Sequence, residues 1–232
     1  KTQQSLLKLQ IQTRATNQET LQAYRLLSNY NIELDETGEA MAKSALEFGR
    51  FTQLGAESIL PLQRLLITTL KIPQDEIPKF VNVLNEAVIE LKNVGVGSYS
   101  EVLDRMQQLT PVALKVAQTV GAAAKMSDAS IAELAQNIIY NGTAAAGAME
   151  KFGVSAENVP RILSLMTKLG TGEMNKFLGF ISGVSGVAAE DIQDSFLQRG
   201  DLTPLIRAMG LTAQRATEDQ MSFYLSQLQE FF

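Results

Sequence analysis

Helix-start signals recur along the whole chain and constrain its fold more than any other feature. A Ser or Thr followed three residues later by Glu or Gln fits a capping box, in which side chains satisfy unpaired backbone N–H groups. Four such pairs predict helix starts: Thr16 with Glu19, Ser98 with Glu101, Ser130 with Glu133, and Thr217 with Gln220. Thr110-Pro111 and Thr203-Pro204 predict two more helix starts, because a proline at the first helical position loses no hydrogen bond.

Apolar residues also recur with a helical period in one segment. That face consists of Phe80, Leu84, Ala87, Val88 and Leu91, at spacings typical of an amphipathic helix. Prolines in "KIPQDEIP" precede it, and Asn93-Val94-Gly95 is a stop signal after it. No stretch alternates apolar and polar residues with β-branched enrichment. We therefore predict an all-α, multi-helix bundle of roughly nine to eleven short helices with no sheet.

The character of the sequence changes after "KIPQDEIP". We expect residues 1–72 to form an N-terminal segment of longer, more polar helices, and residues 73–232 a glycine- and alanine-rich core of shorter helices. The two are either separate or one continuous domain. "LTPVALKVAQTVG" from Leu109 echoes "LTPLIRAMG" from Leu202, but two degenerate copies do not make a repeat array. Because the chain begins at Lys1 and not at Met, we expect a piece of a longer protein or a processed product.

The chain of 232 residues contains neither cysteine nor histidine. This excludes disulfides, thiolate nucleophiles, the common zinc sites and histidine-based triads. Paired carboxylates are the remaining enzymatic alternative. However, Asp35-Glu36 and Glu190-Asp191 lie near predicted helix starts, where the helix dipole favours negative charge. We predict no enzyme, no cofactor and no metal site. A net charge of −5 without a basic run argues against sequence-specific nucleic-acid binding.

Small side chains concentrate in "GTAAAGAM" and "GFISGVSG", residues 142–149 and 179–186. Such faces allow close helix approach, and in lipid they drive helix association. The first interpretation is tight packing inside a water-soluble bundle. The second is membrane insertion after a rearrangement, although a helix over residues 177–189 would reach only about 20 Å. The candidate close helix-packing or membrane-active positions are Gly142, Ala146, Gly147, Gly179, Gly183 and Gly186.

The C-terminal segment has apolar residues on one side of a predicted helix. Tyr224, Leu228 and Phe231 share this side, with Met221 close by. Such a helix either docks on the bundle or joins a partner helix. We favour docking on the bundle.

Two long segments resemble patterns of phage tail tape measure proteins. Residues 84–121, "LNEAVIELKNVGVGSYSEVLDRMQQLTPVALKVAQTVG", resemble an acidic helix, a Leu-x-Pro-like junction and an alanine-rich helix ending in Gly. Residues 144–170, "AAAGAMEKFGVSAENVPRILSLMTKLG", are similar to an alanine-rich helix followed by Phe-Gly-x-Ser and an acidic first turn. "IRAMGLT" is similar to a later Leu-Gly-Leu-Ser/Thr step. Val112 departs from the first pattern, which has Gly after the proline, and residues 1–70 carry no resemblance.

The resemblance implies a structural virion component of the tail, assembled in the cytoplasm of a bacterial host. Such a protein is a long helical chain around which tail-tube subunits assemble, which sets tail length and leaves the tube during DNA ejection. The implied partners are the tail tube protein, tail assembly chaperones and the tail-tip or baseplate hub proteins, with self-association and host membrane contact during ejection. The residues themselves leave two other classes open: a membrane-active pore-forming helical module and a generic helical protein-interaction domain.

Overall fold

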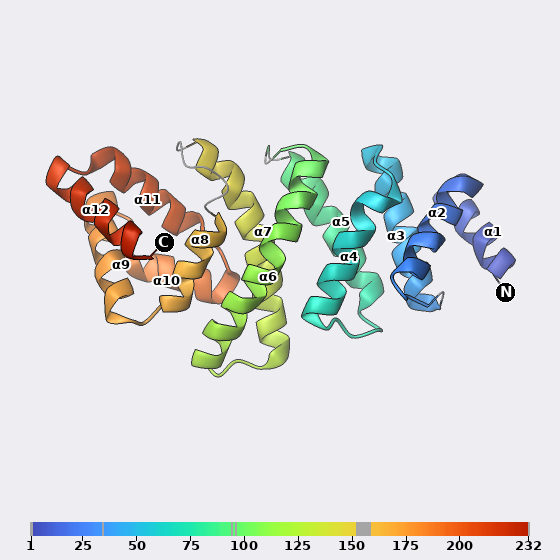
Figure 1. Ribbon diagram of the computed structural model, residues 1–232, viewed down its shortest axis with the longest axis horizontal. Coiled ribbons are helices and arrows are strands. Elements are labelled where there is room, and N and C mark those ends of the chain that lie inside the picture. Colours follow the sequence, from blue (N-terminus) through green and yellow to red (C-terminus); the bar gives the residue numbers. More distant parts are fainter. Residues whose placement is uncertain (1, 34, 94, 96, 152–158, 232) are drawn as a thin grey trace. The chain divides into compact units, whose positions relative to one another are not determined.

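The computed structural model is helical throughout the residues it describes (Figure 1). These are residues 2–33, 35–93, 95, 97–151 and 159–231, with the side chains of 2, 3, 5, 145–151, 213, 225 and 228–231 excepted. This part of the chain holds twelve α-helices, one 3-10 turn and no strand. The all-α prediction is confirmed, whereas the expected nine to eleven helices were too few.

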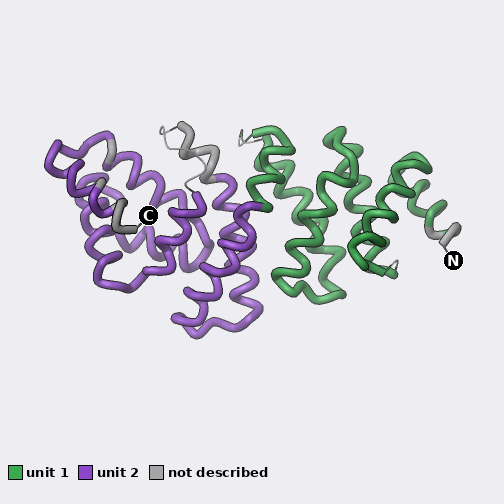
Figure 2. The backbone as a smooth tube through the Cα atoms, viewed as in Figure 1, with its two compact units in different colours: residues 1–107 green, residues 108–232 purple. Residues whose placement is uncertain are grey.

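The helices fall into two compact units, residues 1–107 and 108–232 (Figure 2). Unit 1 contains α1 (Thr2–Thr13), α2 (Asn17–Asn29), α3 (Glu36–Thr52), α4 (Ala56–Leu70) and α5 (Ile77–Asn93). Helix α6 (Tyr99–Ala123) begins in unit 1 and ends in unit 2. Unit 2 continues with α7 (Asp128–Lys151), α8 (Val159–Leu165), the 3-10 turn η2 (Met166–Lys168), α9 (Gly172–Ser185), α10 (Ala189–Arg199), α11 (Thr203–Arg215) and α12 (Glu218–Phe231).

The two units do not divide where the sequence suggested. The expected break between residues 72 and 73 lies inside unit 1, where α5 packs against α3 and α4. The helices after residue 73 are also not uniformly shorter, since α6 and α7, with 25 and 24 residues, are the longest. Tertiary packing outweighs the low helix propensity of glycine here. A Cβ atom on Gly121 of α6 would collide with the side chain of Ile131 in α7.

Three of the four predicted capping boxes are present. The Glu19 carboxylate accepts from the Thr16 backbone N–H at 2.7 Å, while Thr16 Oγ1 accepts from the Glu19 N–H. Ser98 with Glu101 and Thr217 with Gln220 make the same reciprocal pair. Each pair satisfies two backbone groups that the helix itself leaves unpaired. The helix predicted over residues 80–91 is α5, and it ends at Asn93 as predicted.

Two predicted helix starts are wrong. Helix α7 begins at Asp128, and its cap is Ser127 and not Ser130, because Ser127 Oγ accepts from the Ser130 N–H at 3.2 Å. Thr110-Pro111 does not begin a helix but lies in the interior of α6. There Pro111 lacks the N–H that would bond to the carbonyl four residues earlier. Thr203-Pro204 does begin α11, so the two "LTP" segments differ in structure.

Unit 1 is a two-layer array of helices. Helix α1 packs against α2 and α3, α2 against α3 and α4, and α3 against α4 and α5. Each helix therefore contacts mainly the next helix and the next but one. This pattern puts α1, α3 and α5 in one layer and α2 and α4 in the other (Figure 1). Most of its core is apolar, with Leu27, Phe48, Ile59, Leu60 and Leu62 buried almost completely.

One polar cluster interrupts this apolar core. Ser44 of α3, Gln63 of α4 and Asn85 of α5 are 1%, 0% and 9% exposed. Asn85 Nδ2 donates to Ser44 Oγ at 2.8 Å and to the Ser44 carbonyl at 2.9 Å. Gln63 Nε2 donates to Ser44 Oγ at 3.2 Å, while Gln63 Oε1 accepts no hydrogen bond from the described residues. The polar cluster thus ties three helices together but leaves one buried acceptor unpaired, which carries a desolvation cost.

Unit 2 packs around α7, α9, α10 and α11. Helix α11 contacts α7, α9 and α10. The last turn of α11 also caps the C-terminus of α9, since the Arg215 guanidinium donates to the Ser185 carbonyl at 2.9 Å. A basic side chain at a helix C-terminus interacts favourably with the dipole and an unpaired carbonyl. Near the start of α11, Asp201 accepts from the Thr203 N–H at 2.8 Å.

Within unit 2, helix α12 packs against α9 through Tyr224, in agreement with the docking favoured from the sequence. Tyr224 is 5% exposed and stacks on Phe177 of α9 with ring centroids 6.3 Å apart. Phe223 meets Phe180 edge to face at 4.8 Å. Such aromatic pairs contribute about 0.5–1.5 kcal/mol beyond their buried area. The side chains of Leu228 and Phe231 lie outside the described residues.

We expect the buried hydroxyl of Tyr224 to destabilise unit 2 at high pH. Burial raises the pKa of Tyr224 to about 12, so above about pH 10 the unfolded chain releases a proton that the folded chain keeps. Stability therefore falls as pH rises from about 10 towards 12, by up to about 3 kcal/mol. Urea unfolding at pH 7 and pH 11.5 would measure this loss.

Tyr224→Phe is the matched variant for this experiment. Its stability at pH 7 should change little, because the hydroxyl bond to the Met209 carbonyl is long, at 3.5 Å. At pH 11.5 the variant should exceed the wild type in stability. Equal losses in both proteins would show that Tyr224 is not the group responsible.

Candidate functional site

The predicted small-residue positions separate into four groups. Gly142 of α7 is buried, and a Cβ atom there would lie 3.3 Å from Leu109 Cδ1 and 3.6 Å from Leu163 Cδ1. Close packing within unit 2 therefore accounts for this glycine. Ala146 and Gly147 lie in α7, but their surroundings fall outside the described residues, as does the whole Phe152–Ser155 motif.

The glycines of α9 are exposed. A Cβ atom on Gly179 or Gly183 would meet no atom within 4 Å in the part of the chain that the structure describes. Their GxxxG face is thus not a packing face within that part of the chain. Gly186 has a different role, because it ends α9 in the left-handed conformation, with φ +79° and its N–H bonded to the Ser182 carbonyl. Glycine is favoured at such helix ends.

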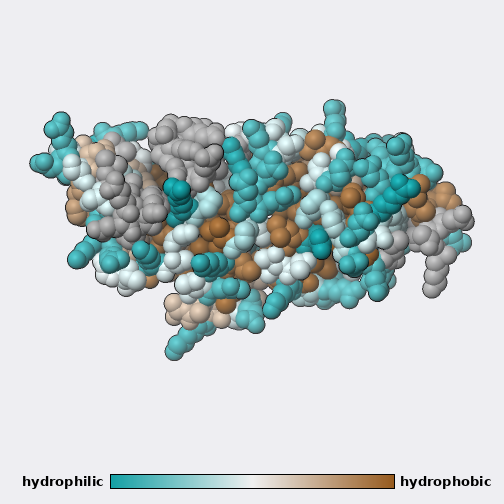
Figure 3. All heavy atoms as spheres, in the orientation of Figure 1, coloured by the Kyte–Doolittle hydropathy of each residue, from teal (hydrophilic) through white to brown (hydrophobic). Residues whose placement is uncertain are grey.

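Apolar side chains also reach the surface. Hydrophobic residues show between hydrophilic ones on the face drawn in Figure 3. Ile11 of α1 is 77% exposed, Phe51 of α3 63% and Phe223 of α12 43%. Phe223 contacts Phe180, which neighbours the open glycines on α9. Single exposed apolar residues are common on soluble proteins, so no one of them marks a site.

The two carboxylate pairs lie at helix starts, as the sequence predicted. Asp35 caps α3, since its carboxylate accepts from the N–H groups of Thr37 and Gly38 at 3.0 and 3.1 Å. Glu190 and Asp191 lie in the first turn of α10. Within the described ranges, no group of three or more acidic residues could hold a metal ion. The same ranges contain no helix that is long and apolar enough to cross a membrane.

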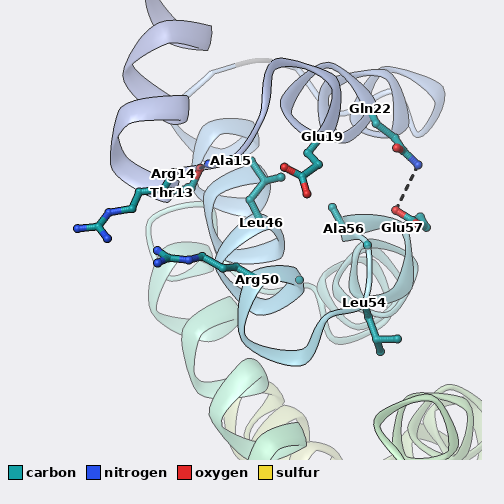
Figure 4. Close-up of a pocket in the computed structure, with 12 residues that line it drawn as sticks. Thr13, Arg14, Ala15, Glu19, Gln22, Leu46, Arg50, Leu54, Ala56 and Glu57 are labelled. Atoms are coloured by element: carbon teal, nitrogen blue, oxygen red, sulfur yellow. Dashed lines mark hydrogen bonds between the residues drawn. The ribbon is translucent and has the colours of Figure 1, made fainter.

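A cleft of about 340 Å³ opens in unit 1 between two helix turns (Figure 4). One wall is the turn from α1 to α2, and the other is the turn from α3 to α4. Arg14, Arg50, Glu19, Gln22 and Glu57 supply polar groups to it, and Leu46 an apolar one. Figure 4 shows the two arginine side chains extending to one side of the cleft, with Gln22 and Glu57 on the other.

The carboxylates of this cleft have partners within the chain. Glu19 accepts from the N–H and Oγ1 of Thr16 at 2.7 and 2.8 Å, and these bonds hold the pKa of its carboxyl below its ordinary value. Glu57 accepts from Gln22 Nε2 at 3.2 Å. Arg14 and Arg50, in contrast, are exposed and make no hydrogen bond or ion pair to the described residues. The two guanidinium groups are therefore the charged groups of the cleft that have no partner among the described residues.

The sequence did not single out this cleft. Arg14 directly follows α1 in a left-handed conformation, with φ +54°, which a non-glycine residue adopts only uncommonly. An arginine in the sequence does not indicate that conformation in advance. The one usable signal is the Thr16 capping box, which places a helix start beside Arg14 but says nothing of Arg50.

Comparison of the chain with protein-family models, with curated proteins and with solved structures finds no match.

Proposed function

We propose that this chain is a structural component of a phage tail, a helical region of the tape measure protein. In this role it acts through contacts with the tail tube protein, the assembly chaperones and the tail-tip or baseplate hub. The resemblance of residues 84–121 and 144–170 to tape measure patterns supports the proposal. The all-helical fold is compatible with it.

The observation that carries the proposal furthest is the local packing of unit 1. Its helices contact mainly the next helix and the next but one. In arrays of this kind, stability is a sum over neighbouring elements, so helices can detach from one end in turn. A tape measure protein has to give up any folded structure when it leaves the tube. A fold held by neighbour contacts allows that without the simultaneous loss of one large core.

The open face of α9 offers a second support. Gly179 and Gly183 are exposed and uncharged, and no described atom covers them. A helix of a tube subunit or of a second copy could approach this backbone closely, since no Cβ atom stands between them. Close approach of that kind would suit a chain enclosed by other subunits.

Electron microscopy of tails after an in-frame deletion tests the proposal. Removing residues 128–232 from the gene takes out the helices from α7 to α12. If the region is stretched as helix in the tail, tails should shorten by about 160 Å, at about 1.5 Å per residue. Gly179→Ala with Gly183→Ala is the control, because it retains the length and should leave tail length unchanged.

Other outcomes of the deletion are also informative. Unchanged length with failed DNA delivery would retain the tail assignment but move the role of this region to ejection. The proposal would be overturned if the deletion particles form and infect normally. It would also be overturned if the gene belongs to a system that makes no tailed particle.

A generic helical protein-interaction domain is the second candidate, favoured by the same two-layer array of α1–α5. The rest of the reading frame separates the two candidates, since several hundred further helical residues beside tail genes would contradict a cellular scaffold. The membrane-active alternative has its own test. Leakage of dye-loaded vesicles caused by the isolated chain would favour it, and a soluble chain without leakage would count against it.

A further inference from the structure

We infer that the cleft of unit 1 binds an acidic peptide segment, with Arg14 and Arg50 holding a carboxylate. The inference stands on the geometry of the cleft and does not depend on the tail assignment. Four helix ends meet at this cleft: α1 and α3 end there, and α2 and α4 begin there. This arrangement brings the two arginines to the cleft, because Arg14 lies just after α1 and Arg50 lies in the last turn of α3.

The hydrogen bonding of the cleft determines what a ligand must supply. Glu19 and Glu57 are already engaged by Thr16 and Gln22. The two guanidinium groups each carry five N–H donors and have no acceptor among the described residues. A ligand that binds these two guanidinium groups must therefore bring acceptors. A carboxylate matches the planar fork of arginine with two parallel bonds, and a charged acceptor makes these bonds stronger than neutral ones.

The rest of the cleft favours a peptide over a small inorganic anion. Ala15 and Leu54 line it and are partly exposed, so both offer apolar surface to a ligand. A phosphate ion offers no apolar surface to these side chains, whereas an acidic side chain on a peptide brings methylene groups and neighbouring residues. The volume of about 340 Å³ lies at the lower end of the range for ligand sites, which suits a short segment.

The backbone around the cleft fixes its shape. A Cβ atom on Gly49 of α3 would lie 2.5 Å from the Leu54 carbonyl oxygen, so the end of α3 and the following turn are in direct contact. A Cβ atom on Gly55 would collide with the Glu57 carboxylate, which folds back over the start of α4. The Glu57 carboxylate thus lies at the N-terminus of α4, where the helix dipole favours a negative charge. A ligand carboxylate would therefore bind on the side of the cleft that carries Arg14 and Arg50.

Isothermal titration calorimetry with a capped peptide tests the inference. The probe is acetyl-Glu-Leu-Glu-Leu-Glu-amide, and the same peptide with Gln in place of Glu is its neutral control. We expect saturable binding of the acidic peptide only. The double variant Arg14→Gln with Arg50→Gln should weaken it at least tenfold. Arg25→Gln, which removes an exposed arginine of α2 outside the cleft, should weaken it less than twofold.

Three results would overturn the inference. They are the absence of saturable binding, an equal loss in Arg25→Gln, and full displacement of the peptide by inorganic phosphate at constant ionic strength. The last result would mean a simple anion site without peptide recognition. Circular dichroism of each variant confirms that the exposed substitutions leave the helices intact.

Discussion

Replacing Gly200 with alanine is expected to lower the free energy of unfolding of unit 2 by about 3 kcal/mol. Gly200 ends α10 with φ +60°, a conformation that costs other residues roughly 1–2 kcal/mol. The new methyl group would also lie 2.7 Å from the Ile138 backbone nitrogen and 3.0 Å from the Asn137 carbonyl carbon. Backbone atoms cannot rotate away as a side chain does, so we expect a further overpacking cost of about 1–3 kcal/mol.

Substitutions at two other glycines separate the cost of the left-handed conformation from the cost of overpacking. Gly186 has φ +79° but open space around it, so Gly186→Ala should cost only the conformational part, about 1 kcal/mol. Gly179 lies in the interior of α9 with the same open space, so alanine there should stabilise by up to about 1 kcal/mol. Urea unfolding followed by circular dichroism measures all three. Equal losses for Gly200→Ala and Gly186→Ala would show that α10 does not end against α7 as described.

The second large effect is expected at the buried polar cluster of Ser44, Gln63 and Asn85. Gln63→Glu keeps the shape of the side chain but introduces an acid at a site that is 0% exposed. At pH 7 the protein must either bury an unpaired charge or keep the acid protonated. Protonation of an ordinary glutamate at pH 7 costs about 4 kcal/mol, which is the upper limit of the loss. We expect unit 1 to lose about 3–4 kcal/mol.

The sign of the pH dependence identifies the cause. Burial would raise the pKa of the new carboxyl above its unfolded value of about 4.3, so its cost is small below that pH and grows as pH rises. Urea unfolding of the variant and the wild type at pH 4.5 and pH 7 should show the difference only at pH 7. Gln18→Glu, at an exposed position of α2, should stay within about 0.5 kcal/mol of the wild type. A loss independent of pH would contradict the buried position of Gln63.

Removing the whole polar cluster should have the opposite outcome. In the triple variant Ser44→Ala, Gln63→Leu and Asn85→Leu, no buried donor or acceptor of the cluster is left unpaired. Replacing both partners of buried hydrogen bonds by apolar groups is often neutral or stabilising. We expect stability equal to or above that of the wild type, although each single substitution is destabilising.

The helix class and most helix starts were predictable because they depend on local chemistry. A capping box involves four consecutive residues, and those at Thr16, Ser98 and Thr217 formed as their spacing required. Ser127 and Ser130 show the limit of this reasoning. Either hydroxyl could cap a helix that starts in this segment. The sequence alone did not favour Ser127, which caps α7 in the structure, over Ser130.

Features that depend on tertiary packing were not predictable from the sequence. Thr110-Pro111 has the composition of a helix start, yet α6 continues through it, as Thr110 is buried in the structure. Gly142 and Gly179 each begin a segment rich in small residues, but Gly142 is enclosed and Gly179 is open. Arg14 and Arg50 are 36 positions apart and share a cleft only because α1 packs against α3.

The neighbour contacts of unit 1 also determine the order in which it can fold during synthesis. Proteins dominated by contacts close in sequence fold within microseconds to milliseconds, whereas translation adds only about 5–20 residues per second. Helices α1 and α2 have been translated before α3, and α3 packs against both of them. These contacts lie within unit 1 and involve no residue of unit 2. We therefore expect the first helices to reach their native packing on the ribosome, before the residues of α7 have been translated.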